Sequence, residues 1–115
     1  MMKAKFEVIL SVEAEAFLSA LKEKVRHKIV SNFRKASYLL DPKVFKKLEG
    51  SDIWEFRALY GGVQYRMLAF GDKTDTNYTL VIATHGFVKK TQKTPSKEIA
   101  KAEKIRTMYF KLKMK

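Results

Sequence analysis

The chain has 115 residues and a mass of 13.3 kDa, which fits one domain over residues 1–115 with a single core. Its hydrophobic fraction of 46% argues against disorder, and the absence of cysteine excludes disulfides and thiolate zinc sites. Lysine and arginine number 24 against 12 acidic residues, and this formal net charge of +12 favours an anionic partner.

The positive charge is concentrated near the C-terminus. Residues 85–115 contain 10 basic and 2 acidic residues, whereas residues 1–84 contain 14 basic and 10 acidic residues. Such a surface attracts phosphate polyanions, and we favour nucleic acid over anionic membranes or acidic proteins. No apolar run approaches the ~20 residues that cross a bilayer, and residues 1–10 are too charged for a signal peptide. A cytoplasmic protein without a membrane partner is expected.

The N-terminal part predicts a strand followed by helix. Residues 5–10 look like a short strand with Phe6, Val8 and Leu10 on one face. Ser11 occupies the position of a helix N-cap. Apolar residues then recur at steps of three and four as far as Phe33, which indicates one helical face. The pattern allows either a single helix to about Lys35 or two helices with a break near residues 22–23.

Turn signals follow this helical region. Asp41-Pro42 interrupts the pattern, because proline suits the first turn of a new helix but not a helix interior. A short helical turn is expected over Val44–Leu48, ending at Gly50.

A hairpin is predicted next. Residues 53–60 and 63–70 alternate with a period of two and flank Gly61-Gly62, and both glycines can adopt a positive φ. In the register of a two-residue turn, Arg57 faces Arg66. Alternation then places eight residues on the face that can cover helices: Trp54, Phe56, Ala58, Tyr60, Val63, Tyr65, Met67 and Ala69.

The opposed arginines allow two interpretations. Two guanidinium groups facing each other across a ladder repel unless an anion lies between them. Glu55 lies on the same face as Arg57 and can pair diagonally with Arg66, which would make this an ordinary charged face. The alternative is a phosphate clamp, in which two fork-shaped donors hold the oxygens of one phosphate.

A last strand and a last helix complete the predicted order β-α(α)-β-β-β-α. After a loop over residues 72–77, residues 78–88 form the most apolar predicted strand. Thr94 is expected to cap a helix that Pro95 opens. The apolar stripe of that helix consists of Ile99, Ala102, Ile105, Tyr109 and Leu112.

Lysines gather between this strand and this helix. Lys89, Lys90 and Lys93 are expected at a rim of the sheet, beside helix N–H groups that also favour anions. A solvated run of charge is the alternative. His85 precedes them, with Val81, Ala83 and Phe87 expected on its face. It fits a buried structural histidine, or else a general acid or base beside the lysines.

Three segments carry a resemblance: residues 48–57 (LEGSDIWEFR), Tyr65-Arg66, and residues 85–95 (HGFVKKTQKTP) followed by Glu98. In this order and spacing they resemble the HigB branch, with its phage-derived members, of the RelE/ParE toxin superfamily. The resemblance covers nearly the whole chain. It implies a compact RelE-like α+β fold, with helices packed on one face of a twisted, mainly antiparallel sheet whose open face receives RNA.

The resemblance also implies a function. It points to a toxin of a type II toxin–antitoxin module that cuts mRNA on the ribosome and is inhibited by an antitoxin with a helix-turn-helix domain. Arg57 and Arg66 match basic strand residues that hold the scissile phosphate. Lys89 and Lys90 match the basic residues after the last strand, and His85 matches a histidine often found there. The expected RNA-binding residues are Lys46, Lys47, Lys93, Arg57 and Arg66.

Metal-independent RNA cleavage suits these residue types. The 2′-oxygen attacks the adjacent phosphate, and planar arginine donors can stabilise the charge that develops. A lysine among other cations loses its proton more easily, so Lys89 or Lys90 is a candidate acid or base, with His85 as a rival. No clustered carboxylates or Cys/His set suggests a metal site, and neither a metal nor a cofactor is expected.

Two other functions remain open at this stage. ParE-like relatives share the fold and inhibit DNA gyrase, and a shared fold does not decide function. A non-catalytic RNA-binding module is the other alternative. It is disfavoured because the hairpin aromatics fall on the helix-covered face, where they cannot stack on bases.

Overall fold

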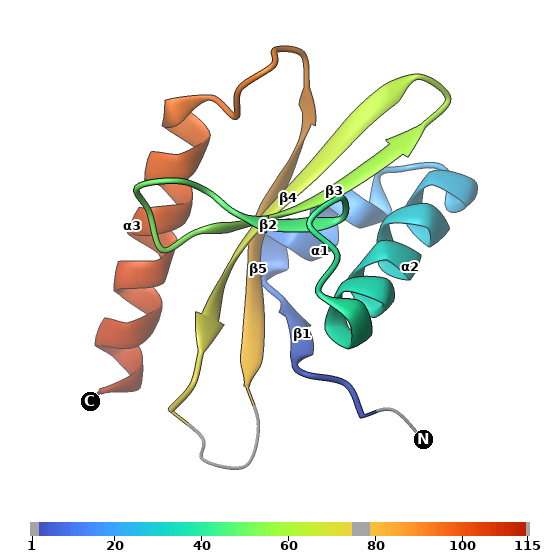
Figure 1. The fold of residues 1–115 in the computed structure, drawn as a ribbon. Helices are drawn as coiled ribbons and strands as arrows, with labels where there is room; N and C mark the ends of the chain where they lie inside the picture. The colour runs from blue at the N-terminus through green and yellow to red at the C-terminus, as the bar shows by residue number, and fades with distance from the viewer. Residues whose placement is uncertain (1–2, 75–78, 115) are drawn as a thin grey trace.

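The computed structural model describes residues 3–74 and 79–114 (Figure 1). The expected α+β class is confirmed, with one strand more than predicted. Tyr78, the expected first residue of the last strand, lies outside the described residues, as do residues 75–77 of the loop before it. No helix in the described part of the chain is long and apolar enough to cross a bilayer. The elements are β1 (Glu7–Leu10), α1 (Val12–Ser19), α2 (Glu23–Leu39), β2 (Phe45–Lys47), β3 (Trp54–Tyr60), β4 (Val63–Asp72), β5 (Leu80–Lys89) and α3 (Ser96–Lys113).

The strands form one sheet in the order β1-β5-β4-β3-β2. β1 runs parallel to β5, and the other neighbouring pairs are antiparallel. Gly61 and Gly62 join β3 to β4 with φ of 58° and 78°, so the predicted two-residue turn is confirmed. Arg57 therefore lies opposite Arg66, as the glycine pair predicts.

The N-terminal helical region consists of two helices. Ser11 caps α1, since its Oγ accepts a hydrogen bond from the amide of Ala14 at 3.0 Å. The same hydroxyl donates to the carbonyl of Thr84 at 2.7 Å, which fixes the start of α1 beside β5. α1 ends at Ser19 and α2 begins after Lys22, so the alternative with a break is the observed one.

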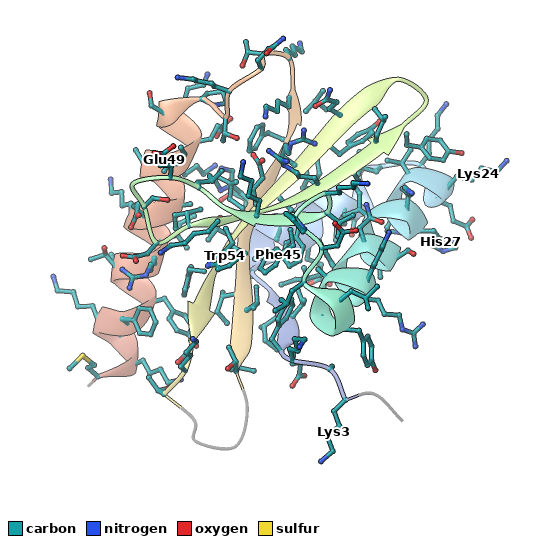
Figure 2. The ribbon with its side chains drawn as sticks, viewed as in Figure 1. Lys3, Lys24, His27, Phe45, Glu49 and Trp54 are labelled. Atoms are coloured by element: carbon teal, nitrogen blue, oxygen red, sulfur yellow. The ribbon has the colours of Figure 1, made fainter. Side chains whose placement is uncertain are left out.

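The helical turn predicted over Val44–Leu48 is wrong, because most of this segment is β2. A single turn forms where the amide of Phe45 donates to the carbonyl of Asp41 at 2.9 Å, and the chain then extends. The ring of Phe45 stacks on that of Trp54, with centroids 4.7 Å apart (Figure 2). It also stacks on the ring of Phe56, with centroids 4.4 Å apart. This stacking across strands stabilises the extended form, and a local helical pattern contains no sign of it.

Helices cover both faces of the sheet (Figure 1). α1 and α2 pack on the face that carries Phe56 and Met67, whereas α3 packs on Leu68 and Phe70 of the other face. The expected packing on one face therefore holds for α1 and α2 and is wrong for α3. α3 covers only the apolar end of its face, and Leu59 near the hairpin turn is 60% exposed. The charged part of that face stays open.

Asp72, the last residue of β4, anchors α3. Its buried carboxylate accepts hydrogen bonds from Oη of Tyr109 at 2.5 Å and from Nζ of Lys113 at 2.6 Å. Burial alone would raise the pKa of Asp72, but these hydrogen bonds hold the pKa well below its usual range. Tyr109 packs on the core as expected, whereas Leu112 of the same predicted stripe is 60% exposed.

A bulge at Thr84 changes which residues of β5 share a face. The pairing of β5 with β4 shifts by one residue there, which reverses the alternation. Val81 and Ala83 face α1 and α2, while His85 faces α3. The predicted grouping of His85 with Val81 and Ala83 is therefore wrong, and its grouping with Phe87 is confirmed.

Gly86 allows α1 to lie close to β5. A Cβ atom at this residue would lie 2.3 Å from Cδ2 of Phe17, far inside van der Waals contact. A residue with a side chain would therefore have to displace the Phe17 ring or separate α1 from the sheet.

Gly86→Ala is expected to lower the free energy of unfolding by about 1–3 kcal/mol, because the added methyl overpacks against Phe17. Gly71→Ala in β4 is the matched control, since a Cβ there meets nothing within 4 Å. Chemical denaturation measures both changes. Adding Phe17→Leu to Gly86→Ala should recover part of the loss, and equal stability of the two alanine variants would contradict the explanation.

Candidate functional site

Arg57 and Arg66 share one buried carboxylate. Glu55, which is 0% exposed, accepts a hydrogen bond at Oε1 from Nε of Arg57 at 3.1 Å. The same oxygen lies 3.4 Å from Nε of Arg66. The pairing with Glu55, one of the two interpretations that the sequence allows, is therefore present. Because one carboxylate faces two guanidinium groups, one positive charge of the pair remains uncompensated.

Thr94 connects the lysine-rich segment to this carboxylate. Its hydroxyl donates to Oε2 of Glu55, so both carboxylate oxygens are bound. The predicted capping role of Thr94 is wrong, because the N-cap of α3 is Pro95 and has no side-chain hydrogen bond. The hydroxyl binds a buried charged acceptor instead of the helix amides.

The two arginines differ in exposure. The side chain of Arg57 is 29% exposed and that of Arg66 is 9% exposed. Arg66 donates from Nη1 to the carbonyl of Tyr65 at 3.1 Å and from Nη2 to Oε1 of Gln64 at 2.6 Å. Burial lowers the pKa of Arg66, with Glu55 opposing and Arg57 adding to the shift. The guanidinium N–H donors of Arg57 are therefore accessible to a ligand from solvent, whereas Arg66 contributes its positive charge from a buried position.

Lys89, the last residue of β5, lies opposite Gln64 and therefore faces the same side of the sheet as Arg66, which completes the group. Burial lowers the pKa of Lys89, and the negative charge of Glu55 opposes this shift. The positive charges of Arg66, Arg57 and Lys46 lower the pKa further. Lys46 lies on β2 opposite Glu55 and therefore faces the same side of the sheet. We call Lys46, Arg57, Arg66 and Lys89 around Glu55 the cationic cluster.

Three other predicted lysines lie outside the cationic cluster. Lys47 pairs with Trp54, so alternation places it on the opposite face of the sheet from Lys46. Lys90 and Lys93 are exposed in the segment between β5 and α3, at the rim beside Lys89. They are placed to meet a ligand from solvent.

His85 is enclosed beneath α3. It is 3% exposed, with Nδ1 3.0 Å from Oγ1 of Thr84 and Nε2 3.2 Å from Oε1 of Glu98. Burial lowers the pKa of His85, and the hydrogen bond to Glu98 opposes this shift. The charge of Lys101 lowers the pKa further, whereas that of Glu13 raises it. The hydroxyl of Thr84 also donates to the carbonyl of Leu68 at 3.2 Å, so its one proton is shared between that carbonyl and Nδ1 of His85. A ring enclosed between Thr84 and Glu98 in this way fits a structural histidine.

Sequence reasoning placed Glu55 beside the two arginines as a possible counter-ion but did not count it among the site residues, and it gave Thr94 no part in the site. For Glu55 a signal existed, because alternation puts it beside Arg57 on the charged face. For Thr94 no local signal exists, since its contact with Glu55 joins residues 39 positions apart. Among residues 3–74 and 79–114, no three His, Asp or Glu side chains lie close enough together to hold a metal ion.

Residues 16–107 match the family of phage-derived Gp49-like proteins (DUF891). This match spans most of the chain and includes the whole cationic cluster, so the chain belongs to that family. The family consists of toxins of toxin–antitoxin modules of the RelE/HigB type, and membership implies an antitoxin partner. No curated protein matches the chain at a significant level.

Glu55→Gln is expected to lower the free energy of unfolding by about 3 kcal/mol, because it leaves two opposed arginines without a buried counter-ion. For a chain of this size, Tm should fall by roughly 10 °C or more. Glu49→Gln is the matched control, because Glu49 is exposed in the turn after β2 (Figure 2). Thermal and chemical denaturation measure both variants.

A double-mutant cycle separates lost charge compensation from lost packing. Arg57→Gln should destabilise the protein less in the Glu55→Gln background than in the wild type, because it then removes one of two repelling charges. Equal effects of Arg57→Gln in both backgrounds would contradict this account of Glu55.

Proposed function

We propose that this chain is a ribosome-dependent endoribonuclease that cuts mRNA without a metal ion and so inhibits translation. The observation that carries the proposal is the cationic cluster, in which Arg57, Arg66 and Lys89 lie on the open part of one sheet face. Membership of a RelE/HigB-type toxin family supports it. The net charge of +12 suits an RNA-rich partner such as the ribosome.

The cluster suits stabilisation of a phosphorane. In the proposed reaction the 2′-oxygen of the RNA attacks the adjacent phosphorus, the bond to the 5′-oxygen breaks, and a 2′,3′-cyclic phosphate forms. Negative charge on the phosphate oxygens increases on the way. Arg57 is the exposed fork that contacts these oxygens, and Arg66 adds a fixed positive charge from a buried position where Coulomb attraction is strong.

Lys89 is the proposed proton acceptor. Its lowered pKa increases the fraction of neutral amine near pH 7, and the neutral amine can take the proton of the 2′-hydroxyl. Lys90, exposed at the adjacent position, is the proposed donor to the leaving 5′-oxygen. His85 takes no part in this scheme, because both of its ring nitrogens are engaged under α3.

The partner that inhibits the toxin is proposed to be an antitoxin with a helix-turn-helix domain. An antitoxin segment that is acidic and apolar would complement the basic surface and neutralise the charges that RNA needs.

Arg57→Ala, Arg66→Ala and Lys89→Ala are each expected to slow mRNA cleavage in a translation extract by about 10²-fold or more. Lys90→Ala should have a similar effect because it removes the proposed proton donor, and Lys104→Ala on α3 is the control with no expected effect. Primer extension on the transcripts locates and quantifies the cuts. Circular dichroism of each variant checks that it is folded.

Two results would overturn the nuclease proposal. Intact mRNA together with lost supercoiling activity of DNA gyrase would favour the ParE-like function. Retained RNA affinity without strand scission by the wild type would favour a non-catalytic RNA-binding protein.

The pH dependence of cleavage tests Lys89 as the base. The rate should rise with pH up to the lowered pKa of Lys89, because only the neutral amine accepts a proton. Lys46→Met should shift this limb to higher pH, since it removes a cation that lowers the pKa of Lys89. Lys47→Met is the matched control, because Lys47 faces the other side of the sheet. Identical pH profiles of the two variants would contradict the assignment.

A further inference from the structure

A second basic surface adjoins the cationic cluster between α2 and β3. It is an open groove of about 470 Å³ whose lining includes Lys28, Asn32, Lys35, Lys43, Arg57 and Arg66. Among the described residues, no Asp or Glu lines it. Its volume falls in the range of roughly 300–1,000 Å³ that is typical of small-ligand pockets. The groove therefore combines a concave shape with positive charge from three segments of the chain.

The backbone of Arg57 holds these segments together. Its carbonyl accepts a hydrogen bond from Nδ2 of Asn32 at 2.8 Å, and its N–H donates to the carbonyl of Val44 at 2.8 Å. Asn32 is only 7% exposed, so this contact fixes one side of α2 against β3. Lys28 and Lys35 lie one turn before and one turn after Asn32 on that side. The hydrogen bond between Asn32 and Arg57 therefore places Lys28 and Lys35 on either side of Arg57.

The turn before β2 adds a third lysine. Lys43 precedes Val44, and its amide donates to Oδ1 of Asp41 at 2.9 Å, which stabilises the turn. Asp41 also lies 3.7 Å from Nζ of Lys35, but this pair is partly exposed, and such pairs contribute little and are screened by salt. Lys28, Lys35 and Lys43 therefore remain available to an anionic ligand.

We infer that this groove binds phosphates of single-stranded RNA that flank the scissile phosphate. The inference rests on the proposed function, because the groove and the cationic cluster share Arg57 and Arg66. A strand held at the cluster can continue along α2, where lysines from separate segments meet successive phosphates. The concave lining suits a flexible strand better than a flat lipid surface. Contacts of this kind position the RNA without reading its sequence.

The test compares two triple variants with the same loss of charge. One carries Lys28→Gln, Lys35→Gln and Lys43→Gln. The control carries Lys97→Gln, Lys104→Gln and Lys111→Gln at exposed positions of α3, a helix that lies across the molecule from α2 (Figure 1).

Fluorescence anisotropy measures binding of each protein to a labelled single strand of about twelve nucleotides, 2′-O-methylated to prevent cleavage, over a range of salt. The groove variant is expected to bind at least about tenfold more weakly at ~0.1 M salt. The slope of log K against log salt should fall by about 2, since each phosphate contact contributes about 0.7 for single strands. The control variant should retain nearly the wild-type slope.

The outcomes separate this inference from the proposed nuclease. If the wild type cuts mRNA but the two triple variants bind alike, the groove assignment is overturned and the nuclease stands. If the groove variant alone loses affinity while the wild type leaves mRNA intact, the groove stands as an RNA site and the nuclease falls. Thermal melting of both variants checks that lost affinity does not reflect unfolding.

Discussion

A buried carboxylate shared by two opposed arginines is the interaction on which the site depends. The Gly61-Gly62 turn fixes a register that places Arg57 opposite Arg66, and two guanidinium groups in that arrangement repel. Glu55 relieves the repulsion from within the same face, yet it compensates only one of the two charges. The carboxylate therefore stabilises the hairpin and at the same time leaves positive charge for an external anion.

The sheet face around Glu55 is divided by the position of α3. Apolar residues at one end, such as Leu68 and Phe70, are buried under the helix, while the cationic end receives no helix. Thr94 joins the two ends, since the segment entering α3 hydrogen-bonds to the carboxylate under the arginines. α3 is thus held at its start by Thr94 and near its end by Asp72, which keeps the lysine-rich segment beside the cationic cluster.

Much of this arrangement could be predicted from the sequence because it depends on local rules. A two-glycine turn and strict alternation were enough to oppose Arg57 and Arg66 and to place Glu55 with them. The rest depends on contacts between distant segments. β2 forms because Phe45 stacks on aromatic rings of β3. The bulge at Thr84 turns His85 to the opposite face of the sheet, and the local sequence pattern does not predict that bulge. Lys46 and Lys47 separate for the same reason, since only a strand, and not a helical turn, sends them to opposite faces.

An excess of clustered positive charge destabilises a compact state, and any anion that binds only the folded chain offsets that cost by mass action. In the proposed function, the cationic cluster and the groove along α2 are sites where RNA or an acidic antitoxin segment would stabilise the same fold. Because both ligands need the same uncompensated cations, they should compete rather than bind together. A toxin that acts as proposed can be inhibited without a change of fold, since carboxylates at Arg57 and Lys89 would remove the positive charge that the proposed reaction requires.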